Sequence, residues 1–88
     1  MQRIENIEAM NMKTASLKIN NTLSTVYIMD YDNSYIISIP DITFSMKVNQ
    51  EVTEEELFEE VVMYLFAFMD QDESEAASSI ICSAIREI

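Results

Sequence analysis

The segment DYDNS at residues 30–34 has the oxygen-bearing side chains of a calcium-binding loop at alternate positions. Asp41 lies at the twelfth position of such a loop, where the last ligand is expected. Tyr35, however, occupies the place where a calcium loop needs glycine for its sharp turn. The spacing therefore favours a polar turn between strands over a metal site.

A second acidic segment, DQDES at 70–74, fits a calcium loop less well. Glu75 stands at the glycine position and Ile81 at the last ligand position. Asp72 followed three residues later by Glu75 instead matches a helix N-cap with its reciprocal partner. We predict that Asp72 caps a helix and that neither segment binds a metal ion.

The chain lacks the side chains on which most catalysis depends. It contains no histidine, the commonest general base, and no glycine, which phosphate-binding loops require. The carboxylates fall at expected helix starts and turns rather than in a cleft, and Cys82 fits a small buried apolar residue. We expect a protein that is not an enzyme, without catalytic, cofactor-binding or metal-binding residues.

Charge is concentrated in the second part of the chain. The net charge is −11, and residues 51–88 hold eleven of the 16 acids but only one of the five bases, Arg86. The other bases are scattered, so they form no patch that would neutralise phosphates. We expect no direct binding to nucleic acid or membranes, and attraction to basic proteins.

Length and composition fit one folded domain spanning 1–88, because 49% of the 88 residues are hydrophobic. Residues 1–11, with apolar side chains at every third position, fit one or two helical turns or a frayed end. This start does not resemble a secretory signal, and the longest apolar run, 61–69, is too short to cross a bilayer. The single cysteine fits a reducing compartment, so we expect a soluble, cytoplasmic protein.

Residues 12–48 show the composition and two-residue periodicity of β-strands. Short polar turns containing Asn and Asp separate four strand-like segments: 12–19, 23–29, 35–39 and 42–48. Connections this short join antiparallel neighbours. We therefore predict an α+β fold, in which a four-stranded antiparallel β-meander is followed by two α-helices packed on one face.

The two helices are predicted over 53–71 and 73–88. Thr53 and Glu56 match a capping box at the start of the first helix. Its apolar arc is about 180° wide, more than contact with one sheet requires, so we expect either the second helix or a partner chain to cover the rest, which makes that part a candidate oligomer interface. This interface comprises Phe58, Val62, Phe66 and Met69. One side of the second helix is small and uncharged, which fits either a close contact with another chain or a solvated face: Ser78, Ser79, Cys82 and Ser83.

Acids along and after the first helix form a candidate partner-binding surface. Glu56 and Glu60 are one helical turn apart and repel each other, and no lysine follows Lys47 to relieve the repulsion. Two interpretations fit, a solubility device or a surface for a basic protein such as a nucleic-acid-processing enzyme. The surface comprises Glu56, Glu59, Glu60, Asp70, Asp72, Glu73 and Glu75.

In size, charge and lack of catalytic residues, the chain resembles the small acidic inhibitors carried by phages and mobile elements: anti-CRISPR, anti-restriction and immunity proteins. The resemblance is one of general character and carries over no residue. It implies a stoichiometric inhibitor that occupies the basic groove of a nucleic-acid-binding enzyme by charge mimicry. The alternatives are a homodimeric structural or regulatory module and an acidic chaperone-like adaptor.

Overall fold

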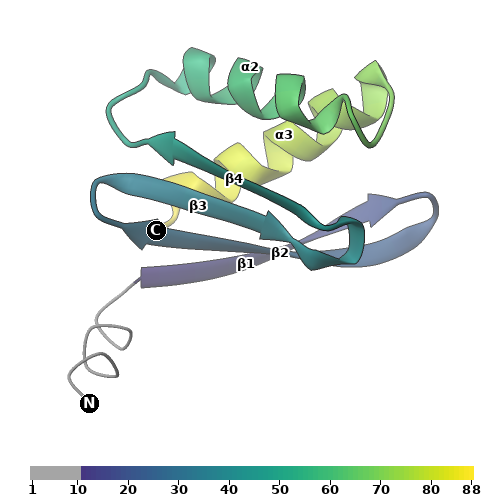
Figure 1. The fold of residues 1–88 in the computed structure, drawn as a ribbon, viewed down its shortest axis with the longest axis horizontal. Helices are drawn as coiled ribbons and strands as arrows, with labels where there is room; N and C mark the ends of the chain where they lie inside the picture. Colours follow the sequence, from purple (N-terminus) through teal and green to yellow (C-terminus); the bar gives the residue numbers. More distant parts are fainter. Residues whose placement is uncertain (1–10) are drawn as a thin grey trace.

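The computed structural model describes residues 11–88 as a four-stranded antiparallel sheet followed by two helices (Figure 1). The strand order β1-β2-β3-β4 means that each strand pairs with the next along the chain. The predicted α+β fold and meander are confirmed, whereas the helical turns predicted at 1–11 lie outside the described residues, apart from Asn11 in β1. The elements are β1 (Asn11–Ile19), β2 (Thr22–Tyr31), β3 (Ser34–Ile39), the 3-10 helix η1 (Pro40–Ile42), β4 (Phe44–Asn49), α2 (Glu54–Leu65) and α3 (Gln71–Arg86).

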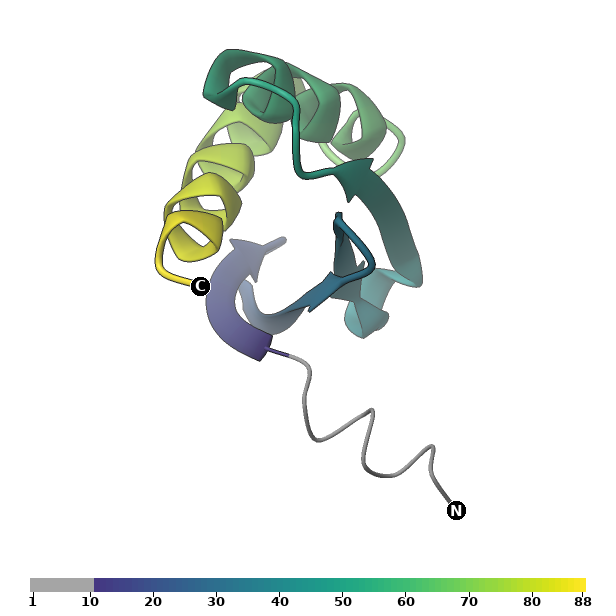
Figure 2. The same cartoon turned by 90° about the vertical axis from the view of Figure 1, so that its left-hand side faces the viewer.

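Alternating side chains give the sheet one apolar face. In β4, Phe44, Met46 and Val48 are buried while the residues between them are exposed, as the sequence pattern predicted. The sheet curls around the core, with α3 alongside β1 and α2 above β4 (Figure 2). The most deeply buried side chains come from both layers: Val26, Ile28, Ile37, Ile39, Val61, Leu65 and Ile81.

Two tight hairpins set the strand register without glycine. The β1–β2 turn is Asn20-Asn21 and the β2–β3 turn is Asp32-Asn33, and all four residues have φ between 52° and 66°. Two-residue loops with both residues at positive φ are type I′ turns, whose twist matches that of paired strands. Asn and Asp tolerate this region better than other residues with a Cβ atom. The predicted polar turns containing Asn and Asp between the first three strands are confirmed.

The calcium-loop alternative in the first acidic segment does not fit this geometry. Asp32 lies in the β2–β3 turn and Asp41 in η1, so the whole length of β3 separates them. Asp30 instead accepts a hydrogen bond from the side chain of Gln50, which also donates to the Ser34 carbonyl at 3.1 Å. These bonds fix the β4–α2 connection to the β2–β3 hairpin.

Both helices begin with a reciprocal capping box. The Thr53 hydroxyl accepts from the Glu56 N–H at 3.1 Å, and the Glu56 carboxylate accepts from the Thr53 N–H at 3.0 Å. Asp70 and Glu73 make the same pair of bonds at the start of α3, at 2.8 and 3.4 Å. Each box satisfies N–H groups that have no partner within the helix. The first box lies where the sequence predicted it, and the second does not.

The prediction that Asp72 caps the second helix is wrong, and α3 spans Gln71–Arg86 rather than 73–88. The pairs Asp70–Glu73 and Asp72–Glu75 have the same spacing, so spacing alone does not decide between them, and the structure has Asp70 as the N-cap. The earlier start adds a hydrogen bond from the Ser74 N–H to the Asp70 carbonyl at 2.8 Å. Asp72 therefore lies inside the first turn of α3.

α2 spans Glu54–Leu65, six residues shorter at its end than the predicted helix over 53–71. The carbonyl of Leu65 accepts hydrogen bonds from the N–H groups of both Phe68 and Met69, which closes a tight turn. This turn places the ring of Phe68 edge-on to Phe44 of β4, with ring centroids 5.6 Å apart. Tertiary packing thus ends the helix before its apolar pattern does.

α2 and α3 pack against each other through small side chains. The fully buried Ser78 donates from its hydroxyl to the Phe58 carbonyl at 2.9 Å, and its Oγ lies 4.0 Å from the Sγ of Cys82. Side chains of this size let the two backbones approach closely. Both interpretations of the serine face are therefore wrong for Ser78, which contacts α2, and the solvated face is wrong for Cys82, which is buried, whereas Ser79 and Ser83 are exposed.

The type I′ turn predicts opposite effects for two substitutions at Asn33. We expect Asn33→Ala to lower the free energy of unfolding by about 1 kcal/mol, because alanine is disfavoured at positive φ. Asn33→Gly should not lower it, because glycine adopts positive φ without steric cost. Urea unfolding measures both, with Asn11→Ala in β1 as the control. Equal losses for the two alanine variants would contradict the turn assignment.

The α2–α3 contact predicts that position 78 does not tolerate a large side chain. We expect Ser78→Ala to cost about 1 kcal/mol of unfolding free energy through the lost hydrogen bond, and Ser78→Leu at least about 2 kcal/mol through overpacking. The neighbouring exposed residue gives the control, Ser79→Leu, for which we expect a change within about 0.5 kcal/mol. Thermal or urea unfolding compares the three, and equal effects of the two leucine variants would refute the contact.

Burial raises the pKa of the Cys82 thiol above its ordinary value of 9.0, against smaller opposing effects of the Ser78 hydrogen bond and the Arg86 charge. The thiol ionises more readily in the unfolded chain, so ionisation favours unfolding at alkaline pH. Between about pH 8 and about pH 10 we expect the unfolding free energy to fall further in the native protein than in Cys82→Ala. Urea unfolding at several pH values measures this, and identical pH slopes would contradict it.

Candidate protein-binding surface

The two layers of the fold differ in charge. The helical layer, residues 51–88, carries eleven acids and one base, Arg86. The described part of the sheet layer, residues 11–50, is balanced, so the excess negative charge of the described chain lies on the helical side. The charged residues of that sheet layer are the acids Asp30, Asp32 and Asp41 and the bases Lys13, Lys18 and Lys47.

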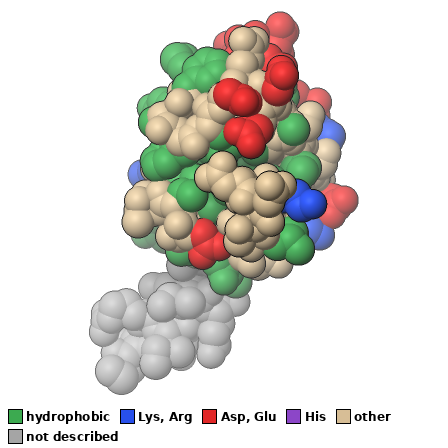
Figure 3. Space-filling model, turned by 90° about the vertical axis from the view of Figure 1, so that its right-hand side faces the viewer, with side chains coloured by type: hydrophobic (Ala, Val, Ile, Leu, Met, Phe, Trp, Pro, Cys, Tyr) green, Lys and Arg blue, Asp and Glu red, His purple; other side chains and the backbone are tan. Residues whose placement is uncertain are grey.

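Carboxylates gather at the turn that joins the two helices. Figure 3 views the molecule from this end, and most of the carboxylates in view lie at its top, over the helical layer, with apolar side chains beside them. Asp70, Asp72, Glu73 and Glu75 are all exposed. This corner of the molecule therefore presents both negative charge and apolar surface.

Three of the seven acids predicted to contact a partner already have a structural role. The carboxylates of Glu56, Asp70 and Glu73 each accept a hydrogen bond from a backbone N–H at the start of a helix. They are exposed and contribute negative charge, but the capping boxes hold their side chains. The predicted surface is thus partly a consequence of helix capping.

An apolar groove between α2 and α3 brings Glu59 and Glu75 together from the two helices. Its volume is about 260 Å³. Met63 and Phe66 line it and are 62% and 49% exposed. The Glu75 carboxylate accepts a hydrogen bond from the Gln71 side chain at 3.1 Å. The full lining is Phe58, Glu59, Val62, Met63, Phe66 and Glu75.

The predicted acidic residues do not form one continuous site. Glu60 follows Glu59 directly, so it lies about 100° further around α2 and does not line the groove. Glu56 is on the same side of α2 as Glu60, one turn away. Of the predicted contact residues, only Glu59 and Glu75 border the groove.

Three of the four residues of the candidate oligomer interface lie together in the structure. Phe58, Val62 and Phe66 line the groove, whereas Met69 lies in the turn after α2 and packs against the core. Met63, which the sequence analysis did not include, also lines the groove. The sequence could have indicated Met63, because it follows Glu59 by four residues and residues four apart share a helix face.

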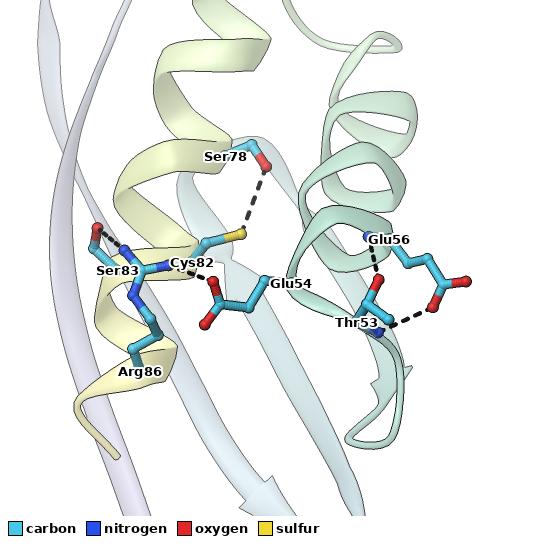
Figure 4. A network of polar contacts seen from close by, with 7 residues as sticks. All are labelled: Thr53, Glu54, Glu56, Ser78, Cys82, Ser83 and Arg86. Carbon is cyan, nitrogen blue, oxygen red and sulfur yellow. Dashed lines mark hydrogen bonds and ion pairs between the residues drawn. The ribbon is translucent and has the colours of Figure 1, made fainter.

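Two ion pairs connect α3 to the rest of the fold. Lys13 of β1 lies 2.7 Å from Glu87, and its hydrogen bond and charge lower the pKa of the Glu87 carboxyl. Arg86 lies 3.7 Å from Glu54 at the start of α2 (Figure 4). Arg86 is the only base of the helical layer and pairs with Glu54, which does not line the groove.

A second hollow, of about 270 Å³, lies where this ion pair joins the two helices. Cys82 and Arg86 line it from α3, Glu54 from α2 and Tyr35 from β3. Figure 4 shows Arg86 directed at Glu54, and the Cys82 sulfur directed at Ser78 rather than at a second reactive group. The charged side chains that line this hollow are Glu54 and Arg86, and their opposite charges cancel.

Within residues 11–88, no three side chains of the types His, Cys, Asp and Glu gather as a metal site would require. None of the helices in this described part is both long and apolar enough to cross a membrane. The most distinctive feature of these residues is the apolar groove with carboxylates at its border.

A profile of YueH-like proteins matches residues 13–87, from β1 to the end of α3. No curated protein and no solved structure gave a significant match. Because the family match covers nearly the whole chain, this protein belongs to the YueH-like family.

Proposed function

We propose that this protein acts by binding, without catalysis, and that it presents its acidic helical layer to a basic protein. The observation that carries the proposal is the separation of charge between the layers. The described sheet residues balance their charges, while the helical layer carries eleven acids against Arg86. A field with this direction orients a cationic partner toward the helices before contact.

The ordered helices that carry the acids support this proposal over a purely solubilising role. The acids lie on two helices whose starts are fixed by capping boxes and whose backbones are held together by Ser78. A charged surface that is already ordered loses little conformational entropy on binding. A disordered acidic tail would give solubility equally well without this order.

The finer proposal is a stoichiometric inhibitor that mimics the charge of nucleic acid. α2 is about 18 Å long at 1.5 Å rise per residue, and its acids continue into the first turn of α3. A nucleic-acid strand presents a phosphate about every 3.4 Å. The helical layer would occupy the basic groove of a cytoplasmic nucleic-acid-binding enzyme, in the manner of anti-CRISPR, anti-restriction or immunity proteins.

Two variants with the same net charge test where the charge acts. Glu59→Gln/Glu60→Gln/Asp72→Asn removes three charges from the helices, and Thr14→Lys/Thr25→Lys/Ser45→Lys adds three opposite charges to exposed sheet positions. At low salt we expect the helix variant to bind about tenfold more weakly and the sheet variant to bind like the native protein. The measurement is displacement of fluorescent DNA from purified basic enzymes: a Cas nuclease, a restriction endonuclease and a colicin-type nuclease.

Displacement at one-to-one stoichiometry that weakens with added salt would support the proposal. Equal loss in both variants would show that net charge alone acts, and would contradict a role for the helical layer. No displacement from any enzyme, together with a salt-insensitive dimer in sedimentation, would favour the homodimeric module. An effect on protein refolding without displacement would favour the chaperone-like adaptor.

A further inference from the structure

The groove between α2 and α3 leaves apolar side chains in water that the fold itself does not cover. Met63 is 62% exposed and Phe66 49%, and both lie beside the partly buried Phe58 and the buried Val62. Apolar surface that is contiguous and has a polar border is typical of an interaction site. The groove thus has the character of a docking surface, and its occupant has to be identified from its chemistry.

The charge at the groove selects a cationic occupant. Glu59 borders it from α2 and Glu75 from α3, so carboxylates stand on both helices. None of the described lysine and arginine residues lines it. A second copy of this chain would bring its own acids against these two carboxylates, which like-charge repulsion disfavours. An anionic lipid surface is disfavoured for the same reason.

The walls of the groove select a helical occupant over an extended one. Helix α2 and the residue after it supply its apolar side chains, and helix backbones use their N–H and C=O groups internally. A peptide strand docked there would find no sheet edge to satisfy its own backbone. An amphipathic helix satisfies its backbone internally and offers apolar residues at i, i+3, i+4 and i+7 to such a groove.

We infer that the α2–α3 groove binds an amphipathic helix of a partner protein, with the apolar face of that helix on Met63 and Phe66 and its Lys or Arg residues beside Glu59 and Glu75. This inference rests on the proposed function and specifies which segment of the basic partner is recognised. The groove distinguishes partners by pattern, because a basic segment without an apolar face leaves Met63 and Phe66 uncovered.

A synthetic peptide tests this inference directly. The probe is a fluorescent peptide of about 14 Leu and Lys residues with Leu at i, i+3, i+4 and i+7, slightly longer than the 12 residues of α2. Its control is an isomer of the same composition in which Leu and Lys are arranged without a helical apolar face. Fluorescence anisotropy with the full-length protein measures both affinities, and we expect the patterned peptide to bind at least about tenfold more tightly.

Matched variants on α2 locate the binding site. Phe66 and Tyr64 are 49% and 48% exposed, but only Phe66 lines the groove. We expect Phe66→Ser to weaken peptide binding at least about fivefold and Tyr64→Ser to change it less than about twofold. Glu59→Gln should weaken binding at low salt more than Glu60→Gln does, because only Glu59 borders the groove.

The outcomes separate this inference from the proposed function. Equal binding of the two peptides, or equal effects of Phe66→Ser and Tyr64→Ser, would overturn the inference while DNA displacement still upheld the proposed function. If neither peptide bound, the inference would also be overturned. If, in addition, the protein displaced no DNA from the enzymes, the proposed function would be refuted too. A native dimer that Phe66→Ser converts to a monomer would assign the groove to a second copy and refute the inference.

Discussion

Close packing of α3 on α2 holds the two helices together as one layer. Because Ser78 is small and donates to the Phe58 carbonyl, the two helices lie side by side. Neither helix alone covers the curved sheet, since α3 lies alongside β1 and α2 above β4 (Figure 2). The acids are thereby restricted to the outer surface of the helical layer, where none of them is buried. The groove is the outer border of this same contact.

That restriction places many like charges near one another, and the helices offset part of the repulsion locally. Glu56, Asp70 and Glu73 accept hydrogen bonds from backbone N–H groups, and an acid in a first turn gains about 0.3 to 1 kcal/mol from the helix dipole. Glu59 lies beyond the first turn of α2, where the dipole contributes little. Helix capping therefore does not account for the charge at Glu59, whereas the proposed cationic partner would.

The sequence predicted those features that depend on near neighbours in the chain. The Asn-rich turns, the alternation in β4 and the Thr53–Glu56 box all join residues within four positions. The cap of α3 was misplaced because Asp70–Glu73 and Asp72–Glu75 have the same spacing, and only the turn after Leu65 selects the first. The environment of Ser78 depends on Phe58, twenty residues away. The periodicity of α2 predicted Phe58, Val62 and Phe66 on one face, but it does not reveal that Glu75 of α3 borders the same groove.

In the proposed binding, the charge of the helical layer and the apolar groove would act at different distances. Carboxylates attract a cationic partner across roughly 10 Å, the screening length at about 0.1 M salt, and carry no information about its shape. Apolar contact acts only after collision, and it distinguishes partners by how they fit. Because the described sheet residues balance their charges, the long-range field would direct the proposed cationic partner to the helical side, where the groove lies. A uniformly acidic surface of the same net charge would attract partners equally to faces that have no groove.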